Sequence, residues 1–243
     1  MAESQEDRPR HQQIAAELRA QIMSRDLPPR AQLPSVSQLV RRYRVANATV
    51  QQALTTLKVQ GFITSRHGTG VFVRDRRSLV VPAETYFTSS PRGYSYQLLS
   101  VGEVQPPADV ATALGLDAKG AAVLRHRLMR HDGEPVELSW SYYPMEIAAG
   151  TPLAGRAEIV GGAPQVLAEL GYPLVRFEDR LSARSPTMEE SKGLNLPDDV
   201  PVIRQFRVVY GKGDRLVEVA IQIKGTHLYE LEYREKIERP LED

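Results

Sequence analysis

The strongest constraint on the fold is the order of helix and turn signals in the first 75 residues. Residues 11–24 place Ile14 and Leu18 four positions apart among polar neighbours, which is the spacing of one apolar stripe on a helix. The prolines of "DLPPRAQLP" end that helix. A second helix is expected to begin after Ser35, because Ser35 and Gln38 have the spacing of a capping box.

A longer helix and a hairpin complete this segment. After the short turn "RVA", residues 47–60 carry Val50, Leu54 and Leu57 on one side, and Gly61 ends the helix. The stretch "GFITSRHGTGVFVR" then alternates like two short strands around a glycine turn. This order of elements predicts a winged helix-turn-helix.

Charge is divided unevenly along the chain. Residues 1–78 hold 13 Lys and Arg against 6 Asp and Glu, a net charge of +7, whereas residues 79–243 carry −6. We therefore expect only the first segment to meet a polyanion. The chain has no cysteine, no apolar run long enough for a membrane span, and no apolar stretch typical of a secretory signal at its N-terminus. A cytoplasmic protein is expected.

The glycine turn "HGTG" has two interpretations. A Gly-x-Gly can cradle a phosphate, but such a loop leads from a strand into a helix. Here "VFVRDRR" continues as a strand and then a charged stretch. The sequence favours a hairpin tip whose backbone approaches a charged surface closely, which glycine permits because it lacks a Cβ atom.

The words "IAAELRAQI", "LPPRAQLPSVSQLVRRY", "TVQQAL" and "GFITSRHGTGVFV" resemble the GntR family of bacterial transcription regulators over nearly all of residues 11–75. The resemblance implies that this segment binds double-stranded DNA at an inverted-repeat operator, as a homodimer, with the wing in the minor groove. The residues expected to contact DNA are Ser35, Ser37, Arg41, Arg42, Arg44, Asn47, Thr49, Gln51, Arg66, His67, Gly68, Thr69 and Gly70.

Several positions depart from the family pattern. Family members commonly carry arginine where this chain has Ser37, Asn47 and Gln51, and Asn or Gln pairs with adenine rather than guanine. Arg44 stands where glycine is usual, and a left-handed conformation there would cost on the order of 1 kcal/mol. Because Ala46 occupies the usual serine cap, Asn47 either caps its helix or reads a base.

The rest of the chain contains a weak repeat. "PPADVATALGL…VLRHRLMRHDGEPVELS" is echoed by "SPTMEESKGLNL…VIRQFRVVYGKGDRLVEVA", and each copy predicts a short helix, a strand, a turn and a strand. The dipeptide at 132–133, Asp-Gly, is a hairpin turn signal, and Thr187 and Glu190 have the spacing of a capping box. The predicted fold is an α+β domain with an antiparallel sheet and helices on one side. We expect a DNA-binding domain over residues 1–75, a linker over 76–84, and a second domain over 85–243 that forms the dimer.

Charged residues share one face of the first predicted hairpin. Alternation places Arg125 and Arg127 on the same side as Glu137, and Arg204 and Glu218 are expected at the equivalent places of the second repeat. One interpretation is a solvated outer face with cross-strand ion pairs. The other is a polar pocket in which arginines hold an anion.

Residues 80–240 resemble the UTRA effector domain of the HutC subfamily, whose fold is similar to chorismate lyase, most clearly in "RLMRHDGEPVELSWSYYP". The resemblance implies an effector pocket. Its expected residues are Arg125, Arg127, Glu137, Glu218 and Lys224, the last near the place of a pocket tyrosine. Gly162 and Pro164 stand where relatives use hydroxyl groups to bind phosphate, so the resemblance supports an anionic ligand without favouring a sugar phosphate.

The sequence therefore predicts a one-component transcription regulator, a repressor that a small anionic effector releases from DNA. No cofactor and no metal are expected, because cysteine is absent and the five histidines lack ligand spacing. Two alternatives remain open: a DNA-tethered enzyme with lyase-like chemistry in the second domain, and a constitutive DNA binder with a non-functional pocket.

Overall fold

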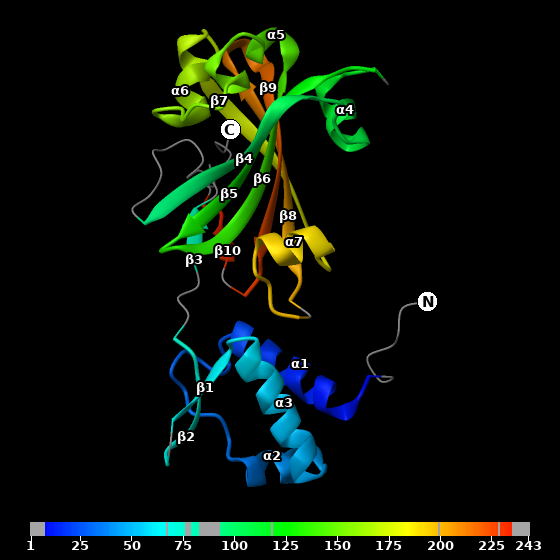
Figure 1. Cartoon of the computed structure of the whole chain (residues 1–243), viewed down its shortest axis with the longest axis vertical. Helices are drawn as coiled ribbons and strands as arrows, with labels where there is room; N and C mark the ends of the chain where they lie inside the picture. The colour runs from blue at the N-terminus through cyan, green and yellow to red at the C-terminus, as the bar shows by residue number, and fades with distance from the viewer. Residues whose placement is uncertain are drawn as a thin grey trace, which may run out of the picture. The chain divides into compact units, whose positions relative to one another are not determined.

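The computed structural model has two compact units, each described by itself (Figure 1). The N-terminal unit comprises residues 1–78 with 197–199, and the C-terminal unit comprises residues 79–196 with 200–243. The structure describes residues 8–66, 68–75, 79–82, 93–117, 119–198, 200–227 and 229–234. Among these residues, no helix has both the length and the apolar composition that a membrane crossing requires.

The N-terminal unit contains the predicted winged helix-turn-helix. Its elements are α1 (Arg10–Met23), α2 (Val36–Tyr43), α3 (Asn47–Val59), β1 (Ile63–Arg66) and β2 (Gly70–Val73). The apolar stripes predicted on the helices meet in a core in which Leu18, Leu39 and Leu57 are fully buried. The segment before α2 pairs with the wing, since the amide of Leu33 donates to the carbonyl of Val71. The helices and the hairpin therefore form one packed body.

The C-terminal unit is built on a six-stranded antiparallel sheet in the order β4-β5-β6-β9-β8-β7 (Figure 1). Its strands are β4 (Tyr94–Val104), β5 (Ala122–His131), β6 (Glu134–Pro144), β7 (Leu174–Arg184), β8 (Val202–Gly211) and β9 (Arg215–Gly225). Its helices are α4 (Ala108–Leu114), α5 (Met145–Ala148), η3 (Pro152–Ala154), α6 (Gly162–Glu169), α7 (Met188–Gly193) and η4 (Lys212–Asp214).

The predicted repeat is confirmed. The order α4, β5, β6 recurs as α7, β8, β9, and β6 pairs with β9 at the centre of the sheet. Asp132 and Gly133 form the first hairpin turn with positive φ angles of 49° and 83°, which the dipeptide Asp-Gly tolerates. The predicted capping box of α7 is present between Thr187 and Glu190.

Helices cover both faces of the sheet, so the expectation of helices on one side was wrong. On the face that we call the helix face, Val110 of α4 packs against Tyr142 and Leu194 beyond α7 packs against Leu138. The opposite face carries Tyr143, which packs against α5, η3 and α6 at one end of the sheet. The short helices after β6 interrupt the repeat and supply this second layer.

A small parallel sheet lies at the other end of this second face. Strand β3 (Leu79–Pro82) pairs in parallel with β10 (Tyr229–Glu232), and Tyr229 packs against Val136 of β6 (Figure 1). Residues 79–82 belong to the range 76–84 that was expected to be a linker, and they form a strand because the run Leu-Val-Val favours extended structure. The remaining residues of that range lie outside the described residues.

Candidate nucleic-acid interface and ligand site

The N-terminus of α2 is a closed capping box. The Oγ atom of Ser35 accepts from the amide of Gln38 at 3.3 Å, and the amide of Ser35 donates to Gln38 Oε1 at 2.7 Å. Ser37 Oγ lies 3.0 Å from Ser35 Oγ and is exposed. Ser35 is therefore a structural residue of the helix start, while Ser37 faces solvent beside it.

Helix α3 presents its polar side chains to solvent from its first residue. The N-cap position is Ala46, which makes no side-chain capping bond, and the helix begins at Asn47. Asn47 therefore does not cap the helix. Asn47 and Gln51 are both exposed one turn apart, and Thr49 is half-buried between them.

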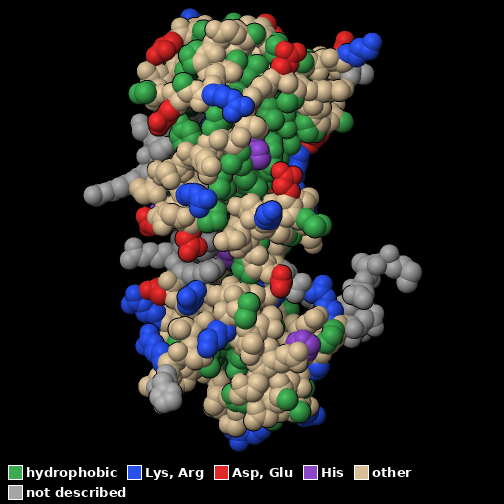
Figure 2. Space-filling model, viewed as in Figure 1, with side chains coloured by type: hydrophobic (Ala, Val, Ile, Leu, Met, Phe, Trp, Pro, Cys, Tyr) green, Lys and Arg blue, Asp and Glu red, His purple; other side chains and the backbone are tan. Residues whose placement is uncertain are grey.

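The arginines in α2 and at its C-terminal end differ in their contacts and backbone conformation. Arg42 makes an ion pair with Glu17 of α1 at 2.9 Å, while Arg41 is exposed on the same helix. Arg44 ends α2 in the left-handed conformation, with φ 52° and ψ 49°, as its place at a usual glycine position predicted. Lys and Arg side chains gather over this unit, including over α2 (Figure 2).

The wing is a hairpin whose tip is held by the segment before α2. Gln32 donates from its side chain to the carbonyl of Thr69 at 2.8 Å, and the guanidinium of Arg66 lies 4.8 Å from the ring centre of Phe72. Gly68 has φ 73° with open space where a Cβ atom would stand, and Gly70 has φ 120°. The tip therefore needs glycine for its backbone conformation. His67 lies outside the described residues.

In the C-terminal unit, strand register brings the five predicted effector residues onto one face of the sheet. Arg127 pairs with Ser139, Ser139 pairs with Gln222, and Glu137 pairs with Lys224. Arg125 and Glu218 follow by alternation on the same side, which we call the polar face. The polar face lies between the apolar end covered by α5, η3 and α6 and the end covered by β10.

Arg125 binds the backbone of its own unit through one nitrogen of its guanidinium group. Its Nη1 atom donates to the carbonyl oxygens of Pro152, Leu153 and Gly155 at 3.3, 3.0 and 2.7 Å. Burial lowers the pKa of Arg125, because the charged form loses solvation. This arginine holds the turn around η3 in place.

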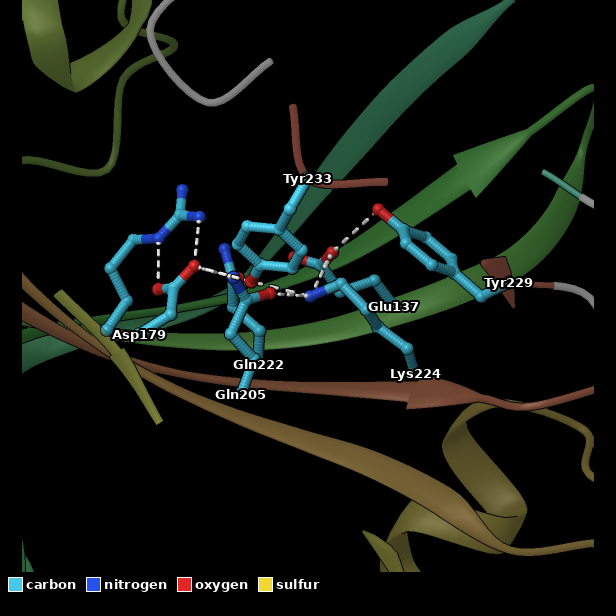
Figure 3. A network of polar contacts seen from close by, with 8 residues as sticks. Glu137, Asp179, Gln205, Gln222, Lys224, Tyr229 and Tyr233 are labelled. Carbon is cyan, nitrogen blue, oxygen red and sulfur yellow. Dashed lines mark hydrogen bonds and ion pairs between the residues drawn. The ribbon is translucent and has the colours of Figure 1, made fainter. Parts of the chain in front are cut away.

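Lys224 and Glu137 form a buried ion pair. Lys224 Nζ lies 3.0 Å from Glu137 Oε2 and donates to Gln205 Oε1 at 2.8 Å and to Gln222 Oε1 at 3.1 Å (Figure 3). Burial lowers the pKa of Lys224, and the charge of Glu137 opposes that shift. Three acceptors use the three protons of the ammonium group, so Lys224 has none left for a ligand in this arrangement.

A second buried ion pair extends the network to the edge of the sheet. Arg207 donates to both oxygens of Asp179 at 2.7 Å, Gln205 donates to Asp179 Oδ2 at 2.8 Å, and Tyr233 does so at 2.8 Å. Burial alone would raise the pKa of Asp179, but the bonds and charge of Arg207 outweigh it and lower that pKa. Neither member of this pair was predicted from the sequence. The only signal was alternation in "VIRQFRVVY".

The expected place of Arg204 was wrong. Arg204 lies on the helix face, where it donates to Asp109 of α4 at 2.5 Å and sits 5.3 Å from the ring centre of Phe206. A shift of one residue moves a side chain to the opposite face of a strand, so Gln205 and Arg207 take the polar face instead.

Glu137 Oε1 and Ser139 Oγ are buried oxygen atoms of the polar face, and neither has a hydrogen-bond partner among the described residues. The two residues lie two positions apart on β6. Arg127 stands beside them and donates to Ser141 Oγ at 2.7 Å. Buried polar atoms are nearly always paired, so these oxygens mark a place where a ligand can supply the missing bonds. Within the described ranges, no three acidic or histidine side chains are grouped so as to hold a metal ion.

Comparison with protein families matches both units. The model of bacterial regulatory proteins of the gntR family matches residues 10–73, and the UTRA domain model matches residues 89–229. An HTH-type transcriptional regulator of Streptomyces coelicolor is 28% identical over 94% of this chain and 93% of its own length. The regulator GgaR of Escherichia coli K12 is 24% identical over 81% of this chain and 79% of its own length.

Solved structures share the fold. A crystal structure of a GntR-family transcriptional regulator is similar over 97% of this chain and all of its own, with a TM-score of 0.61 and 21% identity. PhnF of Mycobacterium smegmatis is similar over 93% of this chain and all of its own, with a TM-score of 0.59 and 20% identity.

Proposed function

Since the chain belongs to the GntR family of bacterial regulatory proteins and carries the UTRA domain that fits the HutC subfamily, we propose that it is a repressor released from its operator by a small anionic effector. The family and its relatives are DNA-binding transcription regulators and not enzymes. In this proposal the N-terminal unit binds an inverted repeat as part of a homodimer in the cytoplasm. The polar face of the C-terminal unit binds the effector.

We propose the operator contacts from the exposure and the charge of side chains on α2 and α3. Asn47 and Gln51 project from the start of α3, which is the part of a recognition helix that enters the major groove. Arg41 and Arg44 are exposed beside them and are suited to phosphate contacts. A two-fold dimer would place two such helices on two half-sites, which is why we propose an inverted repeat.

The effector site rests on one observation: Glu137 Oε1 and Ser139 Oγ are buried without a partner next to Arg127. A carboxylate oxygen needs a donor, and a guanidinium suits an acid group. The proposed effector therefore carries an anionic group for Arg127 and a hydroxyl or amine for Glu137. We assign Arg125 and Lys224 to supporting roles, because Nη1 of Arg125 binds three backbone carbonyls and neighbouring side chains accept all three protons of Lys224.

The remaining alternative is a constitutive DNA binder whose polar face takes no ligand. It differs from the proposal in one measurable respect, since a ligand that binds the folded state raises the melting temperature. Thermal shifts against a panel of phosphorylated sugars, hydroxy acids and amino acids separate the two. A compound that shifts the protein is then tested on Arg127→Ala and on Arg130→Ala, a control at the hairpin end of the same strand.

Selection of binding sites from random duplexes, followed by fluorescence anisotropy, tests the regulator proposal. We expect an inverted repeat whose affinity falls when the active compound is added. Loss of the thermal shift in Arg127→Ala but not in Arg130→Ala supports the effector site. An equal shift in both variants would contradict its location.

A further inference from the structure

Two tyrosines of the C-terminal segment reach the polar face from outside the main sheet. The hydroxyl of Tyr229 on β10 lies 3.5 Å from Glu137 Oε2, and the hydroxyl of Tyr233 donates to Asp179 Oδ2 at 2.8 Å (Figure 3). Both acceptors are carboxylates of the buried ion pairs. The segment after β9 therefore takes part in the network that lies under the proposed effector.

A chain of hydrogen bonds on the polar face connects the contact of Tyr229 with that of Tyr233. Gln205 donates to Asp179 and accepts from Lys224, and Lys224 pairs with Glu137. Hydrogen bonds of this kind in a buried setting depend on one another, because each polarises its neighbours. A ligand that donates to the unpaired Oε1 of Glu137 draws the charge of this carboxylate away from Oε2, which binds Tyr229 and Lys224. It thereby also affects the side chains that lead to Tyr233.

The position of β10 depends on these side chains. Within the described residues β10 pairs only with β3, over four residue pairs, and a two-stranded sheet of this size is marginal by itself. Tyr229 is buried against Val136 and Met129, and its ring lies 5.3 Å from Lys224 Nζ. The parallel pair is therefore held by what β10 contacts on the polar face.

Strand β3 directly follows the DNA-binding unit in the chain. The register pairs Leu79 with Tyr229 and Val81 with Leu231, and only residues 76–78 separate β3 from Asp75, the last described residue of the wing segment. A change in β10 thus acts on the stretch of chain that directly follows residues 1–78 of the N-terminal unit.

We propose that β10 and Tyr233 form a latch through which the effector site controls β3. In the latched arrangement the two tyrosine hydroxyls bind Glu137 and Asp179 and keep β10 paired with β3. An effector that donates to Glu137 Oε1 weakens the bond between Oε2 and Tyr229, loosens the latch, frees β3, and so changes how the DNA-binding unit is presented to its operator. The regulatory part of this inference rests on the proposed function, while the latch can be measured in the protein alone.

Hydrogen exchange of the full chain tests the latch. The variants are Tyr233→Phe, whose side chain is 48% exposed and tolerates the change, and Tyr229→Phe at the buried contact. The matched control is Tyr210→Phe on β8, where the ring stacks under Arg176 outside the network. We expect amides of residues 79–81 and 229–232 to exchange about three to ten times faster in both latch variants, with β8 and β9 unchanged.

Equal exchange of β3 in the latch variants and in Tyr210→Phe would overturn the latch. If Tyr229→Phe does not fold, Tyr233→Phe alone decides. The second readout is affinity for the selected operator without any added compound, where we expect the latch variants to differ from the control by at least about threefold. Faster exchange with unchanged operator affinity would overturn transmission to DNA. A chain that selects no operator would refute the proposed function, and the exchange comparison would still decide the latch.

Discussion

Arg125 and Arg127 lie two positions apart on the same face of β5, yet Arg125 binds three backbone carbonyls of the turn around η3 while Arg127 donates to the hydroxyl of Ser141. One arginine is part of the framework, and the other stands beside the unpaired oxygens of Glu137 and Ser139. Substitutions at these two positions should therefore have different consequences.

We predict that Arg125→Ala lowers the free energy of unfolding by about 3–5 kcal/mol, because several buried carbonyls lose their donor at once. Arg127→Ala should cost about 1 kcal/mol and act mainly on ligand binding. Urea denaturation of both variants measures the difference. Similar losses of stability in the two variants would contradict the division of roles.

The left-handed conformation of Arg44 gives a prediction with opposite effects on stability and DNA binding. Arg44→Gly should stabilise the N-terminal unit by about 1 kcal/mol, since glycine adopts positive φ without steric cost. It should also weaken DNA binding, because the substitution removes a cation that is suited to a phosphate. Arg41→Gly is the control, which should destabilise α2 by about 1 kcal/mol. A lower melting temperature for Arg44→Gly would contradict the strain argument.

DNA binding should depend steeply on salt. A dimer that neutralises about 6 phosphates should give a slope near −5 for log affinity against log salt concentration. Arg41→Ala should make that slope shallower, by about 1 for each phosphate that is no longer neutralised, and Arg42→Ala should weaken all sequences alike. Anisotropy titrations from low to high salt provide the measurement. A slope that Arg41→Ala leaves unchanged would remove this residue from the phosphate contacts.

The operator should be richer in A·T pairs than family operators anchored by guanine. Asn47 and Gln51 are exposed at the start of α3 and match the N6 and N7 atoms of adenine. Gln51→Ala should relax base preference by about 1–3 kcal/mol, and Gln51→Arg should shift it toward guanine. Selection of binding sites from random DNA duplexes tests this prediction. Recovery of a guanine-anchored repeat by the unaltered chain would show that Asn47 and Gln51 do not determine its base preference.

Acid should weaken the C-terminal unit through Asp179. Its folded pKa is lowered, so the stabilisation is present above the unfolded pKa and is lost as pH falls through the folded pKa. At pH 7, Asp179→Asn should cost about 3–5 kcal/mol, because Arg207 is left buried without its partner. That difference should shrink below about pH 4. Asp214→Asn, at an exposed ion pair, should change stability less, and urea unfolding against pH compares the two.

Local patterns predicted the elements well where neighbours in sequence are neighbours in space. The capping boxes at Ser35 and Thr187 and the turn at Asp132 depend on residues within a few positions of one another. The faces of β5 and β6 followed from alternation, because a tight turn sets the register of a hairpin.

Capping boxes, turn signals and alternation do not predict contacts between residues that are far apart in the sequence. Asp179 and Arg207 meet through pairing of β7 with β8, and Tyr229 and Tyr233 arrive from a segment with no local link to Glu137. Arg204 was assigned to the wrong face because two copies of a weak repeat can be aligned one residue apart. Nothing in a single sequence separates these registers before the strands are paired.

The parallel pairing of β3 with β10 also has a consequence for synthesis of the protein. The N-terminal unit is built mainly from contacts between residues close in sequence and can fold as soon as it emerges from the ribosome. Strand β3 must wait for a partner about 150 residues further along the chain, which is a slow kind of contact to form. A nascent or truncated chain would therefore have a finished DNA-binding unit before its connection to the polar face exists.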